Sequence, residues 1–191
     1  MSKGRLEAFS DAVIAIAMTI MVLELKPPHG TDWEAIRPAI PRFLSYVLSY
    51  TFLGIYWNNH HHMLHAAERV NGKILWANLH LLFWLSLVPV TTGWWAESSW
   101  ASLPTAVYGA VLVLAAVAYT LLQNAIVAHH GPESKLAAAI GSDFKGKLSV
   151  GCYLSAVPLA FVHPAIAAAL YVFVAALWLV PDPRIEAKLN R

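Results

Sequence analysis

Long runs of apolar residues, separated by short polar loops, constrain the fold of this chain more than any other feature of its sequence. A helix needs roughly 20 mostly apolar residues to cross a bilayer. Runs of about that length, or somewhat shorter, cover residues 4–25, 41–61, 74–95, 101–128, 148–162 and 164–180. The pattern predicts an all-α integral membrane protein with six transmembrane helices per chain, in a single domain over residues 1–191.

Composition supports the membrane assignment and excludes several classes of protein. The chain is 58% hydrophobic and 13% charged, whereas a soluble domain is about 45–50% apolar and about 25% charged. The loops leave no room for a soluble domain of ordinary size, so we expect the function to reside in the membrane-embedded part. A net charge of +2 and short loops offer no broad basic surface, so we expect no nucleic-acid partner.

The distribution of basic residues predicts the orientation in the membrane. If the N-terminus is cytoplasmic, ten of the thirteen lysines and arginines face the cytoplasm, and only Lys26, Arg37 and Arg42 face the other side. Such a bias is typical of membrane proteins and favours an even number of spans with both termini cytoplasmic. We therefore expect a multi-pass protein of the cell (plasma) membrane, surrounded by membrane lipids, with residues 182–191 as a short solvated tail.

Polar residues gather near the predicted cytoplasmic ends of the first three helices. Asp11 and Ser10 lie near the start of the first helix, histidines 60–62 near the end of the second, and Asn78 on the third. A charged side chain inside a membrane helix costs about 2.5–3.5 kcal/mol on insertion scales. Because unpaired polar groups are also costly there, side chains at one depth are expected to form a hydrogen-bond network between helices.

The histidines leave two other interpretations open. His61 and His65 are four residues apart, which places two imidazoles on one helix face, as a metal site would require. Further ligands are not obvious, so we expect no metal and no enzymatic activity. Alternatively, Asp11, His60 and His61 could form the proton pathway of a proton-coupled transporter, since histidine titrates near neutral pH. A transporter should show internal repeats and broken helices, and Pro158 is the only sign of either.

One face of the first helix carries a regular stripe of side chains. Ala12, Ile16, Thr19 and Leu23 follow each other at steps of four, three and four residues, which keeps them on one side of a helix. Three of them are apolar or small and one carries a hydroxyl. Periodicity alone does not distinguish a pore lining from an ordinary packed or lipid-facing stripe.

A sequence motif adds a resemblance to these patterns. Residues 5–11 read RLEAFSD, which matches the pattern RxxxFSD at the start of a first transmembrane helix, and the chain continues with AVIAIAMTIMVLELKPP. Together with the run WNNHHHMLHAAERVNGKILWANLHLLFWLSLVPV over residues 57–90, this resembles the family of the lysosomal potassium channel called transmembrane protein 175 and its bacterial relatives. The resemblance is specific over about residues 4–95 and only architectural beyond.

The resemblance implies a potassium-permeable cation channel. Bacterial members have one six-helix unit per chain and assemble as homotetramers, and this chain is similar to that form. The first helix of each of the four subunits would line the pore, with no cofactor apart from the permeant K⁺. By position, Ile16 would form the narrowest, hydrophobic ring, Thr19 a hydroxyl ring beside it, and Leu23 a further apolar ring.

The resemblance also implies a structural role for the motif. The motif residues would tie the first helix to the second and third rather than conduct ions. They are Arg5, Phe9, Ser10 and Asp11. Their partners would be His60 or His61, together with Asn78, and the three consecutive histidines leave the choice between the first two open.

Overall fold

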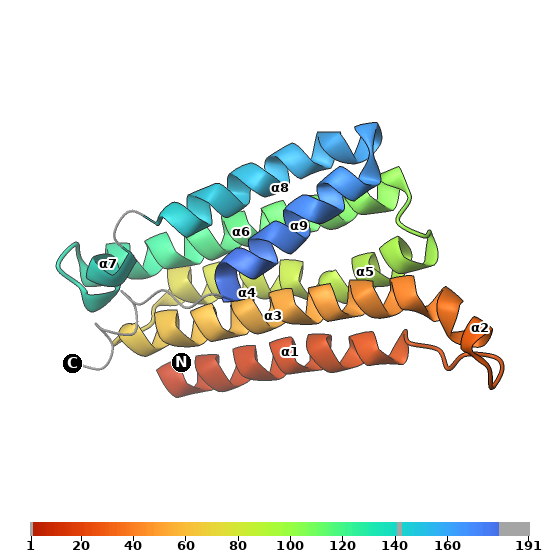
Figure 1. Ribbon diagram of the computed structural model, residues 1–191. Coiled ribbons are helices and arrows are strands. Elements are labelled where there is room, and N and C mark those ends of the chain that lie inside the picture. The colour runs from red at the N-terminus through yellow and green to blue at the C-terminus, as the bar shows by residue number, and fades with distance from the viewer. Residues whose placement is uncertain (1, 141–142, 180–191) are drawn as a thin grey trace.

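The computed structural model describes residues 2–140 and 143–179, and this part of the chain is helical with short connections. The longer helices are α1 (Lys3–Leu23), α3 (Ile40–Ala66), α4 (Gly72–Ser86), α5 (Val88–Glu97), α6 (Ser102–His130), α8 (Phe144–Val162) and α9 (Pro164–Leu179). The short ones are α2 (Trp33–Ile36), η1 (Arg37–Ala39) and α7 (Lys135–Ile140). Figure 1 shows the longer helices side by side in an elongated bundle, with the N-terminus at one end, called here the amino-terminal end.

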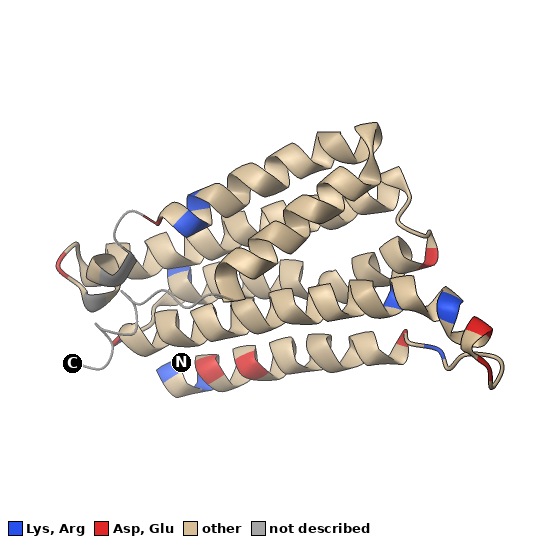
Figure 2. Cartoon of the chain, viewed as in Figure 1, with Lys and Arg blue, Asp and Glu red and all other residues tan. Residues whose placement is uncertain are grey.

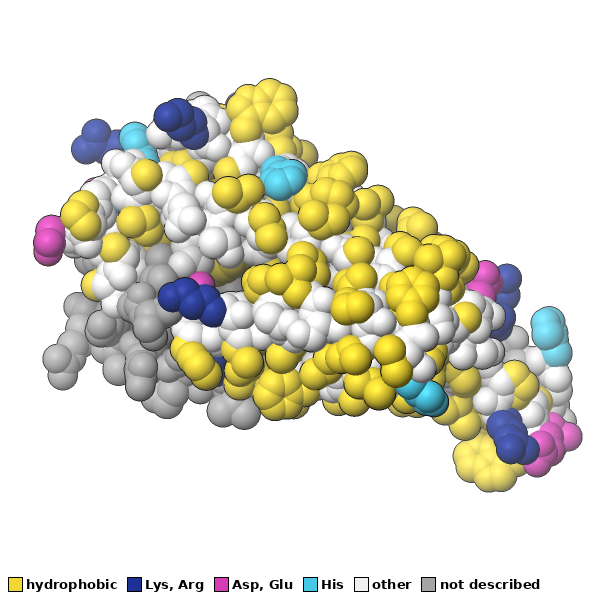
Figure 3. All heavy atoms as spheres, turned by 90° about the horizontal axis from the view of Figure 1, so that it is seen from above, with side chains coloured by type: hydrophobic (Ala, Val, Ile, Leu, Met, Phe, Trp, Pro, Cys, Tyr) yellow, Lys and Arg dark blue, Asp and Glu magenta, His cyan; other side chains and the backbone are white. Residues whose placement is uncertain are grey.

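Length and apolarity identify membrane-crossing helices in the described ranges. Three stretches satisfy both criteria: Lys3–Leu23, Gly72–Glu97, which joins α4 and α5, and Ser102–His130. Lysine, arginine, aspartate and glutamate lie mainly toward the two ends of the bundle (Figure 2). On the face shown in Figure 3, hydrophobic side chains cover the middle between the charged ends. The chain therefore has the architecture of an all-helical membrane protein.

The helix boundaries differ from the sequence prediction in two informative places. The helix predicted over 41–61 continues to Ala66, so the consecutive histidines lie inside α3 rather than at its end. The helix predicted over 74–95 is interrupted at Leu87, because Pro89 in the first turn of α5 has no N–H for the helical hydrogen-bond ladder. The predicted last residue of the sixth helix, Val180, and the predicted tail 182–191 lie outside the described residues.

Buried apolar side chains form two clusters, and α3, α5 and α6 contribute to both. The first cluster joins α1, α3, α4, α5, α6 and α7, with Ile14, Leu81 and Leu122 among its fully buried members. The second joins α3, α5, α6, α8 and α9, around Trp95 and Tyr171. Helix α1 contributes only to the first cluster, and among the described residues it packs mainly against α3, α4 and α5.

The buried side chains of α1 all lie on one face. They are Leu6, Ser10, Ile14, Ala17 and Met21. Their spacing of three or four residues matches the helical repeat, so a single stripe of α1 packs against the bundle. The opposite face of α1 is uncovered in the isolated subunit.

Candidate functional site

Three buried polar side chains meet at the amino-terminal end of the bundle. Ser10 of α1, His60 of α3 and Asn78 of α4 are each at most 1% exposed. His60 Nε2 lies 2.7 Å from Asn78 Oδ1, and Asn78 Nδ2 lies 2.9 Å from Ser10 Oγ. These three residues are called here the amino-terminal network. Their side-chain hydrogen bonds connect α1, α3 and α4.

The hydrogen bonds of this network run in one direction. Ser10 Oγ donates to the Leu6 carbonyl oxygen at 2.8 Å, and therefore accepts from the Asn78 amide nitrogen. The Asn78 amide oxygen then faces His60, so His60 Nε2 must carry a proton. The chain of donors starts at the imidazole of α3 and ends on the backbone of α1. This series of hydrogen bonds stabilises the positions of α1, α3 and α4 relative to one another along their axes.

Asp11 makes a separate contact beside the network. Its Oδ1 accepts a hydrogen bond from Trp57 Nε1 of α3 at 3.0 Å, and the carboxylate is partly exposed. The contact of Asp11 is thus with an indole rather than with an imidazole. Sequence reasoning did not assign Trp57 a role. Its position three residues before His60 places it near the same side of α3, which is the signal that could have identified it.

The other motif residues, Arg5 and Phe9, form no hydrogen bond with the amino-terminal network within one subunit. Arg5 and Phe9 are exposed, and none of the described residues hydrogen-bonds the Arg5 side chain. His61 is also exposed and stacks between Trp57 and His65, with ring centroids 6.1 and 6.2 Å apart. Of the two histidines left open by the sequence, His60 is therefore the one that contacts Asn78.

A second set of histidines holds the loop between α3 and α4. His130 Nε2, near the end of α6, accepts hydrogen bonds from the backbone N–H groups of Glu68 and Arg69 at 3.1 and 3.2 Å. His129 Nδ1 lies 3.1 Å from Asn71 Nδ2. Sequence analysis gave no role to this pair. Their contacts fix the turn that connects the helices carrying His60 and Asn78.

The stripe predicted to line a pore lies on the uncovered face of α1. Ile16 is 56% exposed and Leu23 is 77% exposed, and Ala12 and Thr19 are exposed as well. Thr19 Oγ1 donates to backbone carbonyls of its own helix, with Ala15 O at 2.9 Å and Ile16 O at 3.0 Å. The hydroxyl proton is thereby occupied, and the oxygen lone pairs are left available on the exposed face.

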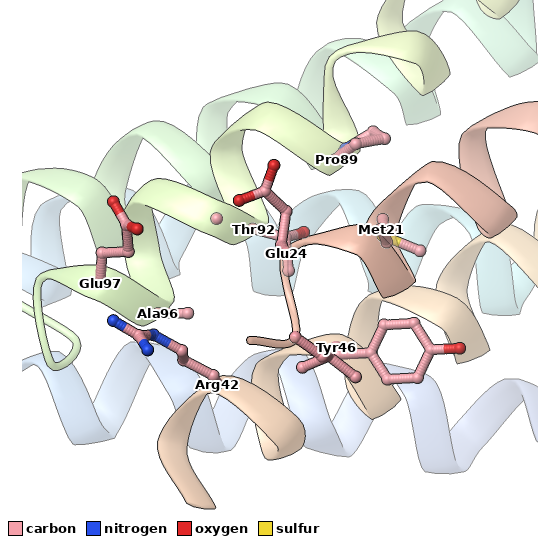
Figure 4. A pocket seen from close by; sticks show the side chains of 10 residues that line it. Met21, Glu24, Arg42, Tyr46, Pro89, Thr92, Ala96 and Glu97 are labelled. Atoms are coloured by element: carbon pink, nitrogen blue, oxygen red, sulfur yellow. The ribbon is translucent and has the colours of Figure 1, made fainter. Parts of the chain in front are cut away.

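A small pocket lies at the far end of α1 (Figure 4). It has a volume of about 20 Å³, space for one or two waters, and lies between α1, α3 and α5. Glu24 follows α1 on one side, while Arg42 extends toward the part of the pocket where Glu97 lies. The pocket thus places both signs of charge where α1 ends.

Within residues 2–140 and 143–179, no group of three or more histidine, cysteine, aspartate or glutamate side chains could hold a metal ion. The rings of His61 and His65 stack with their centroids 6.2 Å apart, but among the described residues they are not part of a group of three possible ligands.

The fold and the site together define a class of protein: an all-helical membrane protein whose first helix is anchored by a buried polar network. Residues 5–89 match the family described as "Endosomal/lysosomal potassium channel TMEM175". A potassium channel of Chryseobacterium sp. (strain P1-3) is 53% identical over 190 residues, covering 100% of this chain and 99% of the relative. The chain belongs to the TMEM175 family.

More distant relatives extend the comparison. A potassium channel of Streptomyces collinus is 36% identical over 62% of this chain and 62% of its own length. The endosomal/lysosomal proton channel TMEM175 of Homo sapiens is 31% identical over 44% of this chain and 19% of its own. A crystal structure of a lysosomal potassium-selective channel TMEM175 homolog from Chamaesiphon minutus superposes with a TM-score of 0.77 at 25% identity, covering 93% of this chain and 96% of that one.

Proposed function

We propose that this chain is a potassium-permeable cation channel that assembles as a homotetramer, with α1 of each subunit lining a central pore. Its bacterial relatives are named potassium channels, and one of them matches this chain over its full length. Channels of this kind move ions rather than transform substrates, so the protein is not an enzyme. The observation that carries the pore assignment is the uncovered face of α1, which holds Ile16, Thr19 and Leu23.

The chemistry of this face suits a pore with a hydrophobic constriction. Four copies of Ile16 would form an apolar ring that resists hydration, and dewetting of such a ring can gate conduction. One turn further on, Thr19 would present oxygen lone pairs, because its proton is bound to the backbone of its own helix. These oxygens would replace part of the hydration shell of a weakly hydrated cation such as K⁺, the only bound species that conduction requires.

The proposal includes the topology. Helices α3, α8 and α9 would complete six crossings with α1, α4–α5 and α6, and residues 1–191 would form one channel domain. The amino-terminal end of the bundle would face the cytoplasm, together with both termini, in the plasma membrane. The bias of basic residues toward that side supports this orientation.

The amino-terminal network acts in this proposal as an anchor for α1. Its hydrogen bonds end on the Leu6 carbonyl of α1 itself, and Asp11 accepts a hydrogen bond from Trp57 instead of from His60 or His61. This favours a channel over a proton-coupled transporter that uses Asp11, His60 and His61. Asp11 and its indole partner, with Arg5 and Phe9 nearby on α1, would hold the start of α1 beside α3.

The test is the conduction of two α1 variants in planar bilayers. Ile16→Asn places amides at the apolar ring, so basal cation current should rise several-fold while the preference for K⁺ over Na⁺ falls. Thr19→Val should lower the K⁺ preference and leave the apolar ring in place. Single-channel currents and reversal potentials in K⁺/Na⁺ gradients measure both effects.

The matched control is Ile166→Asn, the same substitution at an exposed position of α9. It should leave conductance and selectivity unchanged. Unaltered permeation in both α1 variants, or a stable monomer by mass measurement in detergent, would show that this face of α1 does not line a pore.

A further inference from the structure

A second, partly open cavity lies in each subunit, away from the proposed pore face of α1. It occupies the space between α3, α6, α8 and the end of α9, and its volume is about 60 Å³. One enclosed water needs about 10–15 Å³ by this measure, so the cavity has room for roughly four to six water-sized groups. None of its described lining residues belongs to α1.

The walls of this cavity are aromatic. Five of the described lining residues carry rings, and they come from four helices: Phe52, Tyr56, Tyr119, Tyr153 and Trp178. The face of an aromatic ring attracts a cation through its quadrupole. One of these rings already interacts with a cation in the structure: the Lys145 ammonium lies 5.8 Å from the centroid of the Trp178 ring.

The polar groups of the lining have mostly used their donors within the protein. Thr120 donates to the Ala116 carbonyl, Ser149 to the Lys145 carbonyl, and the Asn59 amide to the Ile55 carbonyl. What these three side chains leave for a ligand is mainly acceptor oxygen. A ligand that supplies positive charge and no acceptors complements such a lining.

One lining hydroxyl faces the pocket without a partner among the described residues. The Tyr153 side chain is 2% exposed overall, and no described residue forms a hydrogen bond with its hydroxyl. No fully buried side-chain oxygen or nitrogen of the described residues lacks a partner, so this hydroxyl lies at the open space of the pocket. Its oxygen is therefore available to interact with whatever occupies the pocket.

A single charged side chain, Asp143, stands among the described lining residues. Asp143 has a left-handed backbone (φ 43°, ψ 46°) and caps the start of α8 by accepting from Gly146 N at 3.3 Å. A Cβ at residue 146 would lie 2.6 Å from the carboxylate oxygens, so glycine leaves the space that the carboxylate fills. Burial raises the pKa of this carboxyl above its usual range, against the opposing effect of Lys147.

From these features we infer that the cavity binds a small organic cation, of the trimethylammonium class, with Asp143 as counter-ion and the aromatic rings as walls. Aromatic residues that surround a methylated ammonium are an established means of recognising such groups. A trimethylammonium group fits the available volume. The site lies toward the amino-terminal end of the bundle, so in the proposed orientation it is reached from the cytoplasmic side.

The test is equilibrium binding of radiolabelled choline to the purified full-length protein in detergent. Choline should bind, and its uncharged isostere, with carbon in place of the quaternary nitrogen, should compete about tenfold more weakly, because loss of about 1.4 kcal/mol is a tenfold change. Asp143→Asn should weaken choline binding about tenfold while the amide still caps α8. Glu133→Gln, which removes a carboxylate outside the cavity, should have no effect.

Two further arms separate this site from other sources of binding. Ile16→Asn should leave choline affinity unchanged, and a parallel loss would place the cation in the pore and overturn the cavity assignment. Binding that disappears in phosphatidylcholine nanodiscs but persists in phosphatidylglycerol nanodiscs would assign the cavity to a lipid headgroup instead of a soluble amine. Equal affinity for choline and its isostere, or unchanged binding by Asp143→Asn, would also overturn the proposal. None of these outcomes depends on whether the protein conducts K⁺.

Discussion

Two hydrogen-bond networks lie in opposite halves of the bundle and hold different sets of helices. The amino-terminal network of Ser10, His60 and Asn78 joins α1 to α3 and α4. The other, called here the distal network, joins α3, α5, α6 and α9. It consists of Ser49, Thr92, Trp95, Thr105, Tyr108 and Tyr171. Since α1 takes no part in the distal network, the helix that we propose to line the pore is held by the amino-terminal network, by the hydrogen bond between Trp57 and Asp11, and by its buried apolar stripe.

The two networks also differ in the size and apolar area of the side chains that form the hydrogen bonds. In the distal network, Ser49 Oγ lies 2.9 Å from Tyr108 Oη, and the Tyr108 ring stacks on Trp95 at a centroid distance of 4.8 Å. Aromatic residues therefore combine a polar tip with a large buried apolar surface. The amino-terminal network depends on an amide, an imidazole and a small hydroxyl. Its loss should displace α1, whereas loss of a distal hydrogen bond should mainly lower stability.

The largest effect is expected for Asn78→Leu. This change leaves the His60 N–H without an acceptor and removes the donor to Ser10 Oγ, which still donates to the Leu6 carbonyl. About 1–3 kcal/mol of stability should therefore be lost. Thermal denaturation followed by size-exclusion chromatography should show little assembled protein. Asn124→Leu, at an exposed position of α6, is the matched control. If the two variants assembled equally well, the amino-terminal network would not anchor α1.

A smaller effect is expected in the distal network for Gly109→Ala. A methyl group at this position would overlap the Tyr171 hydroxyl, and overpacking of this kind costs about 1–3 kcal/mol. Tyr171→Phe should partly rescue Gly109→Ala, although alone it removes the hydrogen bond to the Thr105 carbonyl. Gly151→Ala, where the added methyl meets no atom within 4 Å, should be neutral or stabilising in the same thermal assay. If Tyr171→Phe did not restore any thermal stability to Gly109→Ala, close packing between Gly109 and Tyr171 would not explain the loss.

The smallest effects provide the most direct comparison, because the two networks contain serines that are equally buried. Ser10 and Ser49 are both 0% exposed, and replacing either with alanine should cost about 1 kcal/mol in thermal stability. Only Ser10→Ala should also change single-channel conductance, since it frees α1 from Asn78. Equal changes in conductance for the two variants would remove the functional distinction between the networks.

The sequence predicted much of the helical order because membrane helices have a strong and simple signal. Their ends were less accurate: polar residues after Trp57 suggested a helix terminus, yet α3 continues because a helix satisfies its backbone hydrogen bonds whatever its side chains. The choice between His60 and His61 required the rotation of α3 about its axis, which packing determines. The sequence patterns that we used contain no information about that rotation.

The distal network escaped prediction for a different reason. Serine, threonine and tyrosine are common in membrane helices, and the pair Ser49 and Tyr108 is separated by 59 positions in the chain. No spacing rule relates such residues before the helices are placed beside one another. The amino-terminal network was accessible because its residues form part of a recognisable motif and because an aspartate or histidine in an apolar run requires an explanation.

The participation of α6 in both apolar clusters has a consequence for biosynthesis. A chain that emerges from the ribosome presents α1 to α5 before α6 exists, so neither cluster can close at that stage. The hydrogen bonds among Ser10, His60 and Asn78, however, need only the first 78 residues. These bonds can align the early helices in the bilayer while translation continues, and α6 then inserts against a template that already exists. The polar contacts would thus serve as a temporary scaffold during synthesis as well as an anchor in the mature protein.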